Sequence, residues 1–287
     1  MIQSKIIKKM TPFAIAAVLT LTLFAVFAAP AVALTPAYPV CEIIRAEESY
    51  AQYFYLGDAL ADVQDGDTIK LQENIDYYAH GISIEDIRVT FDVNGFILNV
   101  TCADETTGRD ALDVNGGDVL LIDTSSSGGG EFNVVTLIEN GAGVYARNGG
   151  KANVTNAAGY YGVYANASAA VKVAGNVSGV ACGVYANNSA VTVDGVIETE
   201  NQYIIVDDTE MAETGHKTTS TRPGYFEYAG GKGSVWVKDP AASNGGGSGA
   251  NGENQTKIGG SLFLIGGLAL VLVLAAAVLF YMQKMRK

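Results

Sequence analysis

Histidine, tryptophan and cysteine are scarce in this chain of 287 residues, which has two, one and three of them respectively. The two histidines, His80 and His216, lie in unrelated contexts and leave almost no material for a histidine-based metal site or an activated nucleophile. Cys41, Cys102 and Cys182 are too far apart for a CxxC metal cluster or a disulfide framework, and at most one bridge can form. We therefore expect no metal centre and no cofactor, and whether two of the cysteines are bridged stays open.

Positive charge is scarce in the middle of the chain. All 30 acidic residues lie within residues 34–257, together with only 12 of the 18 basic residues. Such an excess of negative charge repels nucleic acid and anionic lipid, and it favours either a plain solvated exterior or a cationic partner. We expect no nucleic-acid partner.

Long apolar runs are absent except near the two ends. Residues 1–33 combine a basic start, an apolar stretch over residues 13–29 and the small-x-small sequence Ala31-Val32-Ala33. This order is typical of a secretory signal peptide that is removed from the mature protein. The mature chain is predicted to begin at Leu34, outside the membrane that the ribosome faces.

The C-terminal end has the order of a membrane anchor. Residues 241–257 are rich in Gly, Ser and Asn and are predicted to be a flexible linker. Residues 258–282 contain no charged residue and are long enough to span a bilayer, so we expect a transmembrane helix there. The basic residues of 283–287 then stay cytoplasmic, which puts the rest of the chain outside the cell. Residues 253–257 lack the Pro and Gly of a Leu-Pro-x-Thr-Gly sorting signal, and sortase processing stays an open alternative.

The middle of the chain repeats a short motif. Gly-Val-Tyr-Ala occurs at residues 143–146, 162–165 and 183–186, and each copy precedes an Asn-rich turn and a short alternating apolar run. The pattern predicts two short strands and two turns in each unit of about 20 residues. Such a unit cannot bury its own apolar face and must stack on copies of itself. Because the unit has strands and no helical segment, we predict an all-β parallel β-helix.

A short helix is predicted before the repeats. Tyr50, Phe54, Leu60 and Val63 suit one apolar face of an amphipathic helix over residues 47–64. A stack of strands needs a cover over its open apolar end, and a short helix is a suitable one. We interpret residues 34–54 as an N-terminal lead with the start of this cap.

Residues 55–60, 65–69 and 87–98 together resemble the opening of the pectin-lyase-like, right-handed parallel β-helix proteins of bacterial surfaces. With the Gly-Val-Tyr-Ala units, the resemblance spans about residues 55–240. It implies a right-handed parallel β-helix outside the cell. The same motifs occur in adhesins, binding proteins and polysaccharide lyases, so the resemblance implies a fold and a compartment more than an activity.

Four charged residues form the candidate catalytic group. Arg88 and Asp92 recur as Arg109 and Asp113 in an Arg-x-x-x-Asp-Val-Asn-Gly echo with a spacing of 21 residues. If the two copies stack, the four side chains share one sheet face, as a lyase of the pectate-lyase type would need for Ca²⁺ on the acids and Arg as the base. The simpler interpretation is a surface ladder of opposite charges, worth less than about 1 kcal/mol per pair.

Three tyrosines form the candidate binding site. If the valine of each motif points inward, the following tyrosine points outward, which aligns Tyr145, Tyr164 and Tyr185 one strand apart. Exposed rings of this kind can bind the faces of sugars. The alternative is that they only stabilise the stacked units by mutual contact.

Six Asn-x-Ser/Thr sequences could accept glycans, but Asn is also a common turn residue, so their glycosylation stays open; they begin at Asn99, Asn153, Asn166, Asn176, Asn187 and Asn254. We expect a single-pass, membrane-anchored surface protein that acts without catalysis in adhesion or in recognition of a carbohydrate or a protein partner. The alternatives are an extracellular polysaccharide lyase and a structural spacer.

Overall fold

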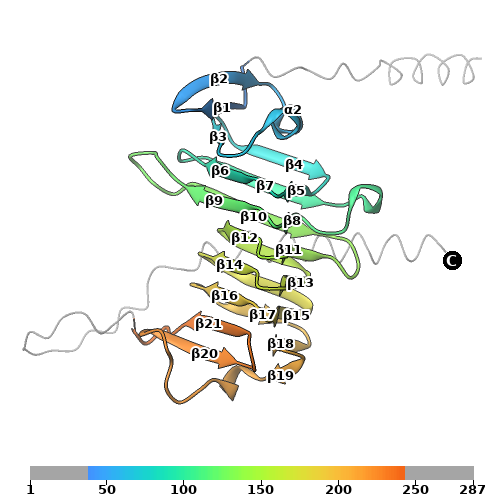
Figure 1. Cartoon of the computed structure of the whole chain (residues 1–287), viewed down its shortest axis with the longest axis vertical. Coiled ribbons are helices and arrows are strands. Elements are labelled where there is room, and N and C mark those ends of the chain that lie inside the picture. The colour runs from blue at the N-terminus through green and yellow to red at the C-terminus, as the bar shows by residue number, and fades with distance from the viewer. Residues whose placement is uncertain (1–37, 243–287) are drawn as a thin grey trace, which may run out of the picture. The chain divides into compact units, whose positions relative to one another are not determined.

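The computed structural model describes residues 38–242 and consists mainly of β-strands (Figure 1). The all-β class predicted from the sequence is confirmed. The predicted signal peptide, transmembrane helix, basic tail and most of the linker lie outside the described residues. Within residues 38–242, no helix combines the length and the apolar composition that crossing a bilayer requires.

The strands form two sheets, of ten and eleven strands, that are mostly parallel. Their parallel parts make three ladders, A, B and C, and the chain visits A, then B, then C before it returns to A. Each such visit to the three ladders is called a round below. In Figure 1 successive rounds lie side by side from the blue end of the described chain to the orange end.

Ladder A belongs to the ten-stranded sheet, and its strands are β3 (Thr68–Leu71), β6 (Arg88–Asp92), β9 (Asp118–Ile122), β12 (Lys151–Val154), β14 (Ala170–Val173), β16 (Ala190–Val193) and β21 (Ser234–Lys238). Ladders B and C make up the eleven-stranded sheet. Ladder B has β4 (Ile75–Ala79), β7 (Ile97–Cys102), β10 (Glu131–Thr136) and β17 (Ile197–Thr199). Ladder C has β5 (Ile82–Glu85), β8 (Leu112–Asn115), β11 (Ala142–Arg147) and β18 (Gln202–Val206). Two long strands, β13 (Asn156–Asn166) and β15 (Val177–Asn187), run through both.

These long strands change the predicted repeat unit from two strands to three. The first part of β13 pairs with β10, and its second part pairs with β11. A shift of register between Gly159 and Tyr161 marks the passage from one ladder to the other. The sequence pattern missed this segment because Ala157, Ala158 and Gly159 lack the alternation of a half-exposed strand.

The Gly-Val-Tyr-Ala motif has a physical reason at each position. Val163 and Ala165 are completely buried, and Tyr164 between them is partly exposed, as a period of two requires. Gly162 lies where the chain is crowded, because a Cβ there would lie 2.4 Å from Val177 Cγ1 and 2.7 Å from the Gly183 carbonyl oxygen. The glycine therefore lets neighbouring rounds approach, the valine and alanine fill the core, and the tyrosine faces outward.

Antiparallel strands end ladder A at both ends and ladder C at its C-terminal end. At the N-terminal end β1 (Cys41–Arg45) pairs antiparallel with both β3 and β2 (Glu48–Tyr53). At the other end β20 (Tyr225–Ala229) pairs antiparallel with β21, and β19 (Thr209–Met211) with β18. Two short 3₁₀ helices, η2 (Glu105–Thr107) and η3 (Glu213–Gly215), lie in the connections.

The predicted capping helix is only half right. Helix α2 covers Leu56–Asp62, and its Leu56 and Ala59 join the core, whereas residues 48–53 form strand β2. Tyr50 and Phe54, which were assigned to the apolar face of the helix, are 53% and 45% exposed. Two exposed aromatic side chains had imitated a helical period in a segment that pairs as a strand.

An asparagine ladder follows one edge of ladder B. Asn99 donates to Asp76, Asn133 to Asn99, and Asn156 to Asn133, each from a side-chain amide to a side-chain oxygen on the preceding strand. Asn176 continues the line by donating its backbone N–H to the Asn156 side chain. Asparagine thus links successive rounds here, a role in stacking beyond the turn role expected from the sequence.

Candidate functional site

The tyrosine column has the register predicted from the sequence. Tyr145, Tyr164 and Tyr185 are direct partners on three adjacent strands of ladder C. The rings of Tyr145 and Tyr164 meet edge to face with centroids 5.4 Å apart, and those of Tyr164 and Tyr185 are stacked at 4.4 Å. The prediction of inward valines is confirmed by the complete burial of Val144, Val163 and Val184.

Sequence reasoning missed a fourth ring of this cluster. The Tyr161 ring lies 5.2 Å from that of Tyr164 and 6.4 Å from that of Tyr185, and Tyr160 lies edge to face beside Tyr161 at 5.3 Å. The signal was present in the sequence, since Tyr160-Tyr161 directly precedes the second Gly-Val-Tyr-Ala motif. Strict alternation hid it, because alternation would put Tyr161 on the same side as the buried Val163.

Charged side chains stand at both ends of the column. Arg147 forms an ion pair with Asp113 at 2.9 Å, and its guanidinium lies 5.3 Å from the centre of the Tyr145 ring. This hydrogen-bonded pairing raises the pKa of Arg147. At the opposite end the Tyr185 hydroxyl donates to Asp208, and this hydrogen bond raises the pKa of Tyr185. Burial, followed by the neighbouring Tyr185, raises the pKa of Tyr164 to about 12, so these phenols are neutral donors at physiological pH.

The stacking decides which parts of the rings a ligand can reach. Because Tyr164 and Tyr185 lie almost parallel, with 13° between their planes, each covers one face of the other. The column therefore offers ring edges and hydroxyl groups, together with the Arg147 guanidinium. That combination suits hydroxylated ligands and also accounts for mutual stabilisation of the rounds, so the two roles given to the tyrosines from the sequence are compatible.

The four candidate catalytic residues do not come together. Arg88 and Asp92 lie on β6 in ladder A, Asp113 lies on β8 in ladder C, and Arg109 lies in the connection before β8. The predicted stacking of the two Arg-x-x-x-Asp copies is wrong, because the copies belong to different sheets. β6 instead pairs with β9, and β8 pairs with β5 and β11.

None of the four candidate catalytic residues forms an ion pair with another member of the four. Arg88 lies 3.7 Å from Asp118, which also pairs with Lys151 at 3.3 Å, so ladder A carries an exposed line of alternating charge. Asp113 pairs with Arg147, and Arg109 forms none of the ion pairs found in residues 38–242. The ladder of opposite charges expected from the sequence exists, but between other residues.

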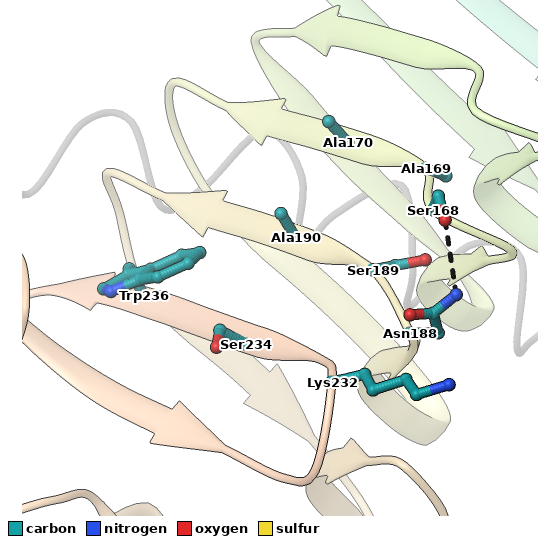
Figure 2. Close-up of a pocket in the computed structure, with 9 residues that line it drawn as sticks. All are labelled: Ser168, Ala169, Ala170, Asn188, Ser189, Ala190, Lys232, Ser234 and Trp236. Atoms are coloured by element: carbon teal, nitrogen blue, oxygen red, sulfur yellow. Dashed lines mark hydrogen bonds between the residues drawn. The ribbon is translucent and has the colours of Figure 1, made fainter.

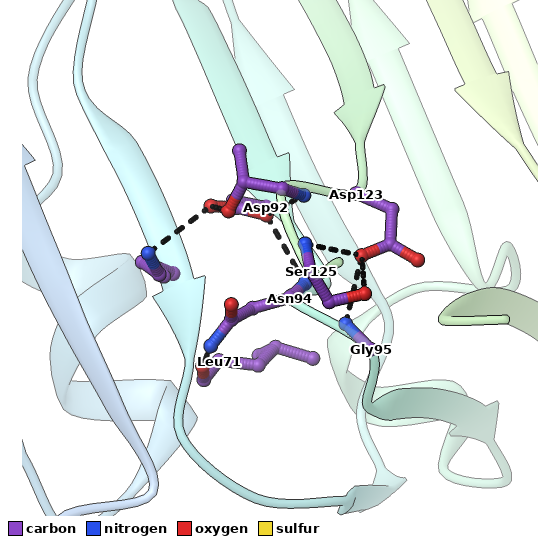
Figure 3. Close-up of polar contacts among 8 residues, drawn as sticks. Leu71, Asp92, Asn94, Gly95, Asp123 and Ser125 are labelled. Carbon is purple, nitrogen blue, oxygen red and sulfur yellow. Dashed lines mark hydrogen bonds and ion pairs between the residues drawn. The ribbon is translucent and has the colours of Figure 1, made fainter. Parts of the chain in front are cut away.

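Asp92 has a structural environment (Figure 3). Its carboxylate is 3% exposed and accepts hydrogen bonds from the backbone N–H of Asn94 and of Thr124 and from the Thr124 hydroxyl. Lys70 Nζ lies 3.8 Å away. These donors occupy the carboxylate oxygens, and they join the turn after β6 to the connection after β9. Among the described residues, no group of His, Cys, Asp or Glu has the arrangement of a metal site.

The three cysteines are buried and unbridged in the described part of the chain. Burial raises the pKa of Cys182 to about 12, which keeps this thiol protonated. Cys182 is a small, completely buried side chain just before the third motif, and its Sγ donates to the Val184 carbonyl oxygen.

A shallow hollow of about 310 Å³ lies on the outer face of ladder A near its C-terminal end (Figure 2). Trp236 stands at one end, and Lys232 and Asn188 stand at the other. Small side chains form the floor between them, and the lining residues not yet named are Ser168, Ala169, Ala170, Ser189, Ala190 and Ser234. The sequence offered no signal for it, because its lining combines β14, β16 and the residues before them with β21 and Lys232, which lie about 40 residues further along the chain.

Comparison with known proteins returns no match: no protein-family model, no curated protein and no solved structure is similar to this chain.

Proposed function

We propose that the chain is a single-pass cell-surface protein whose extracellular part is a right-handed parallel β-helix. It acts without catalysis, in adhesion or in recognition of a carbohydrate or a protein partner. The sequence supports the location through the predicted signal peptide of residues 1–33 and the predicted membrane helix of residues 258–282.

The β-helix is supported by the cyclic order of the ladders. Successive rounds pass through ladders A, B and C, and each ladder pairs a strand with the strand one round later, in parallel. A chain that repeats this order forms a coil with an apolar interior, and the connections between parallel strands of one sheet are overwhelmingly right-handed. The antiparallel strands and helix α2 at the N-terminal end are the proposed cap.

Recognition is supported by one observation above all, the outward tyrosine column on ladder C. Five tyrosines gather there, at positions 145, 160, 161, 164 and 185, beside the guanidinium of Arg147. Tyrosine and arginine are enriched at binding surfaces because they combine apolar area with hydrogen-bonding groups. A structural spacer would need the stacking of the rings but not the Arg147 guanidinium beside them.

A glycan array probed with the full-length chain in a zwitterionic detergent tests this proposal. We expect binding that falls at least about tenfold when Tyr145, Tyr164 and Tyr185 are replaced together by alanine. The matched control replaces three exposed tyrosines elsewhere, Tyr38, Tyr55 and Tyr78. If no glycan binds, a pull-down of surface proteins with the same two variants tests the protein-partner form of the proposal. Equal binding by both variants would contradict the tyrosine column as the site.

The polysaccharide lyase is the alternative, and no geometric observation favours it, since its four candidate residues are divided between two sheets. An absorbance assay for unsaturated products on pectic substrates, with Ca²⁺ present, separates the two functions. We expect no such product. Product that disappears with Asp113→Asn would establish the lyase and overturn the non-catalytic proposal.

A further inference from the structure

We propose that the hollow beside Trp236 is a separate binding site for a neutral hexopyranose within a glycan. This inference rests on the proposed recognition function but places it on ladder A, away from the tyrosine column of ladder C (Figure 2). Three features carry it: a fixed aromatic ring, a fixed polar end and a flat floor between them.

The indole of Trp236 is held in place by three residues that are not part of the lining of the hollow. Its Nε1 donates to Thr221 Oγ1 at 3.2 Å and to Glu227 at 3.3 Å, and the Arg222 guanidinium lies 3.8 Å from the ring centre. None of these three partners lines the hollow. Glu227 is itself 2% exposed and anchored by Lys217 and Thr221. The pre-positioned indole itself lines the hollow, and an aromatic surface of this kind packs against the C–H face of a sugar.

The polar end is fixed by one carboxylate. Asp207 accepts hydrogen bonds from the backbone N–H groups of Asn188 at 2.7 Å, Lys232 at 2.6 Å and Gly233 at 2.8 Å. These backbone hydrogen bonds lower the pKa of Asp207, so it keeps its charge over the physiological range. The Asn188 and Lys232 side chains thus start from an ordered backbone. Ordering of this kind lowers the entropy lost on binding.

The floor of the hollow lies where one row of outward-facing residues on ladder A changes from charged to small side chains. In register, this row runs through Arg88, Asp118 and Lys151 and then through Ala170, Ala190 and Ser234. The long charged side chains stop where the hollow begins. The change leaves room above two methyl groups and a hydroxyl, directly beside the Trp236 ring.

The chemistry of the lining selects a neutral, hydroxylated ligand. Lys232 forms none of the ion pairs of residues 38–242, and its ammonium can donate to hydroxyl groups, as the Asn188 amide and the Ser234 hydroxyl also can. The Asp207 carboxylate accepts from the Lys232 backbone N–H, so a negative charge lies close to Lys232. The excess of acidic residues in residues 34–257 disfavours a uronic or sulfated sugar. A volume of about 310 Å³ is at the small end of ligand sites and suits one or two sugar rings.

The single tryptophan of the sequence makes the test direct, because every change in indole fluorescence comes from this site. The full-length chain in a zwitterionic detergent is titrated with neutral oligosaccharides of glucose, galactose, mannose and N-acetylglucosamine, and with oligogalacturonate. We expect a saturable shift in emission with at least one neutral series. The concentration at half-saturation should rise at least about tenfold in Ala190→Lys and in Lys232→Ala.

The variant Ala170→Lys tests whether a loss of binding could come from misfolding instead of from a filled hollow. Its direct partner on β12 is already a lysine, so the position accepts this side chain in the fold while the new chain fills the hollow. Lys151→Ala on the same row, outside the hollow, is the matched control and should leave the titration unchanged.

The outcomes separate this inference from the proposed function. Glycan binding that is lost in the tyrosine variant, with no change in tryptophan emission and no effect of Ala190→Lys, would support the proposed function and contradict the hollow as a binding site. Stronger binding of oligogalacturonate than of every neutral series would overturn the assignment to neutral sugars. Absence of any glycan binding would overturn the hollow as a sugar site. A tryptophan shift abolished by Ala170→Lys but untouched by the tyrosine variant would establish it.

Discussion

The rounds up to Arg147 and the rounds from Lys151 to Val206 use the same three ladders but are built differently. The early rounds are long and unequal, as Arg88 pairs with Asp118 and Asp118 with Lys151, whereas the late rounds are short and nearly equal, as Lys151 pairs with Ala170 and Ala170 with Ala190. The early core contains large side chains such as Phe91 and Phe132. From residue 151 to residue 193 every buried apolar residue is valine, alanine or cysteine, and larger buried side chains return only in the last late round, at Ile197, Ile204 and Ile205. A uniform core of small residues therefore goes with a uniform repeat, and unequal rounds need side chains fitted one by one.

The contacts that hold the connections between strands in place also differ between the early and the late rounds. The early rounds use buried or bridging carboxylates, such as Asp92 and Asp123, to hold long connections in place. Glycines at positions too crowded for a Cβ occur in both parts, such as Gly141 in the early rounds and Gly162 in the late rounds. Carboxylate clasps on long connections thus distinguish the irregular part of the molecule, whereas close backbone contact is common to both parts.

Truncation of a large early side chain should have the largest effect. Phe132 is completely buried, with its ring centroid 4.9 Å from that of Phe91. We expect Phe132→Ala to lower the free energy of unfolding by about 4 kcal/mol, whereas Val184→Ala in a late round should cost about 2 kcal/mol. Urea unfolding of each variant measures both values. Equal losses would break the distinction between fitted and uniform cores.

Addition of one methyl group to a late round should be almost as harmful. Gly162→Ala places a Cβ 2.4 Å from Val177 Cγ1 and 2.7 Å from a backbone carbonyl, so we expect a loss of about 3 kcal/mol. Gly149→Ala is the control, since it adds only the strain of a φ of +79° in open space and should cost about 1 kcal/mol. Thermal unfolding followed by circular dichroism compares them. If Gly162→Ala proved the milder change, close packing of the late rounds would not be their main constraint.

Loss of an early clasp should have a smaller effect. Asp92→Asn keeps the size of the side chain but turns one acceptor oxygen into a donor that faces the N–H and O–H groups of Asn94 and Thr124. We expect a loss of about 2 kcal/mol. Hydrogen–deuterium exchange should show faster exchange in residues 92–96 and 123–130, with little change in the late rounds. Asp123→Asn, which alters a more exposed clasp, should cost about 1 kcal/mol.

The C-terminal hairpin provides a test of similar or smaller size that depends on pH. Burial alone would raise the pKa of Glu227, but hydrogen bonds from Lys217 and Thr221 outweigh it and lower the pKa to about 2. Since the folded pKa is below the unfolded one, this group stabilises the fold above about pH 4.5, and the contribution is lost as pH falls towards 2. We expect about 2 kcal/mol of stability to disappear over this range. Glu227→Gln should flatten the decline, measured as the urea midpoint at each pH, and a decline as steep as that of the parent chain would assign it to other carboxyl groups.

The late rounds were predictable because their sequence repeats their structure. The spacing of the Gly-Val-Tyr-Ala motifs predicted that Tyr145, Tyr164 and Tyr185 align, and they do. The early rounds are irregular, and the prediction made from their sequence was wrong. The Arg88 and Arg109 copies share letters but lie in different sheets, because long connections remove any fixed relation between spacing and register. The hollow beside Trp236 was beyond reach for a related reason, as β21 pairs with β16 only after a long excursion through β18, β19 and β20.

The antiparallel strands at the two ends affect whether copies of the chain can pair edge to edge. A stack of parallel strands exposes, at each end, a template on which another copy could continue the same pairing without limit, as in a fibril. Here β1 and β2 reverse direction at one end, and β19 and β20 reverse it at the other. Exposed polar side chains of β2, Glu48 and Gln52 among them, add a further obstacle. Ladder A thus ends in an antiparallel strand on both sides, so a second copy finds no strand of the parallel run at either edge of this ladder.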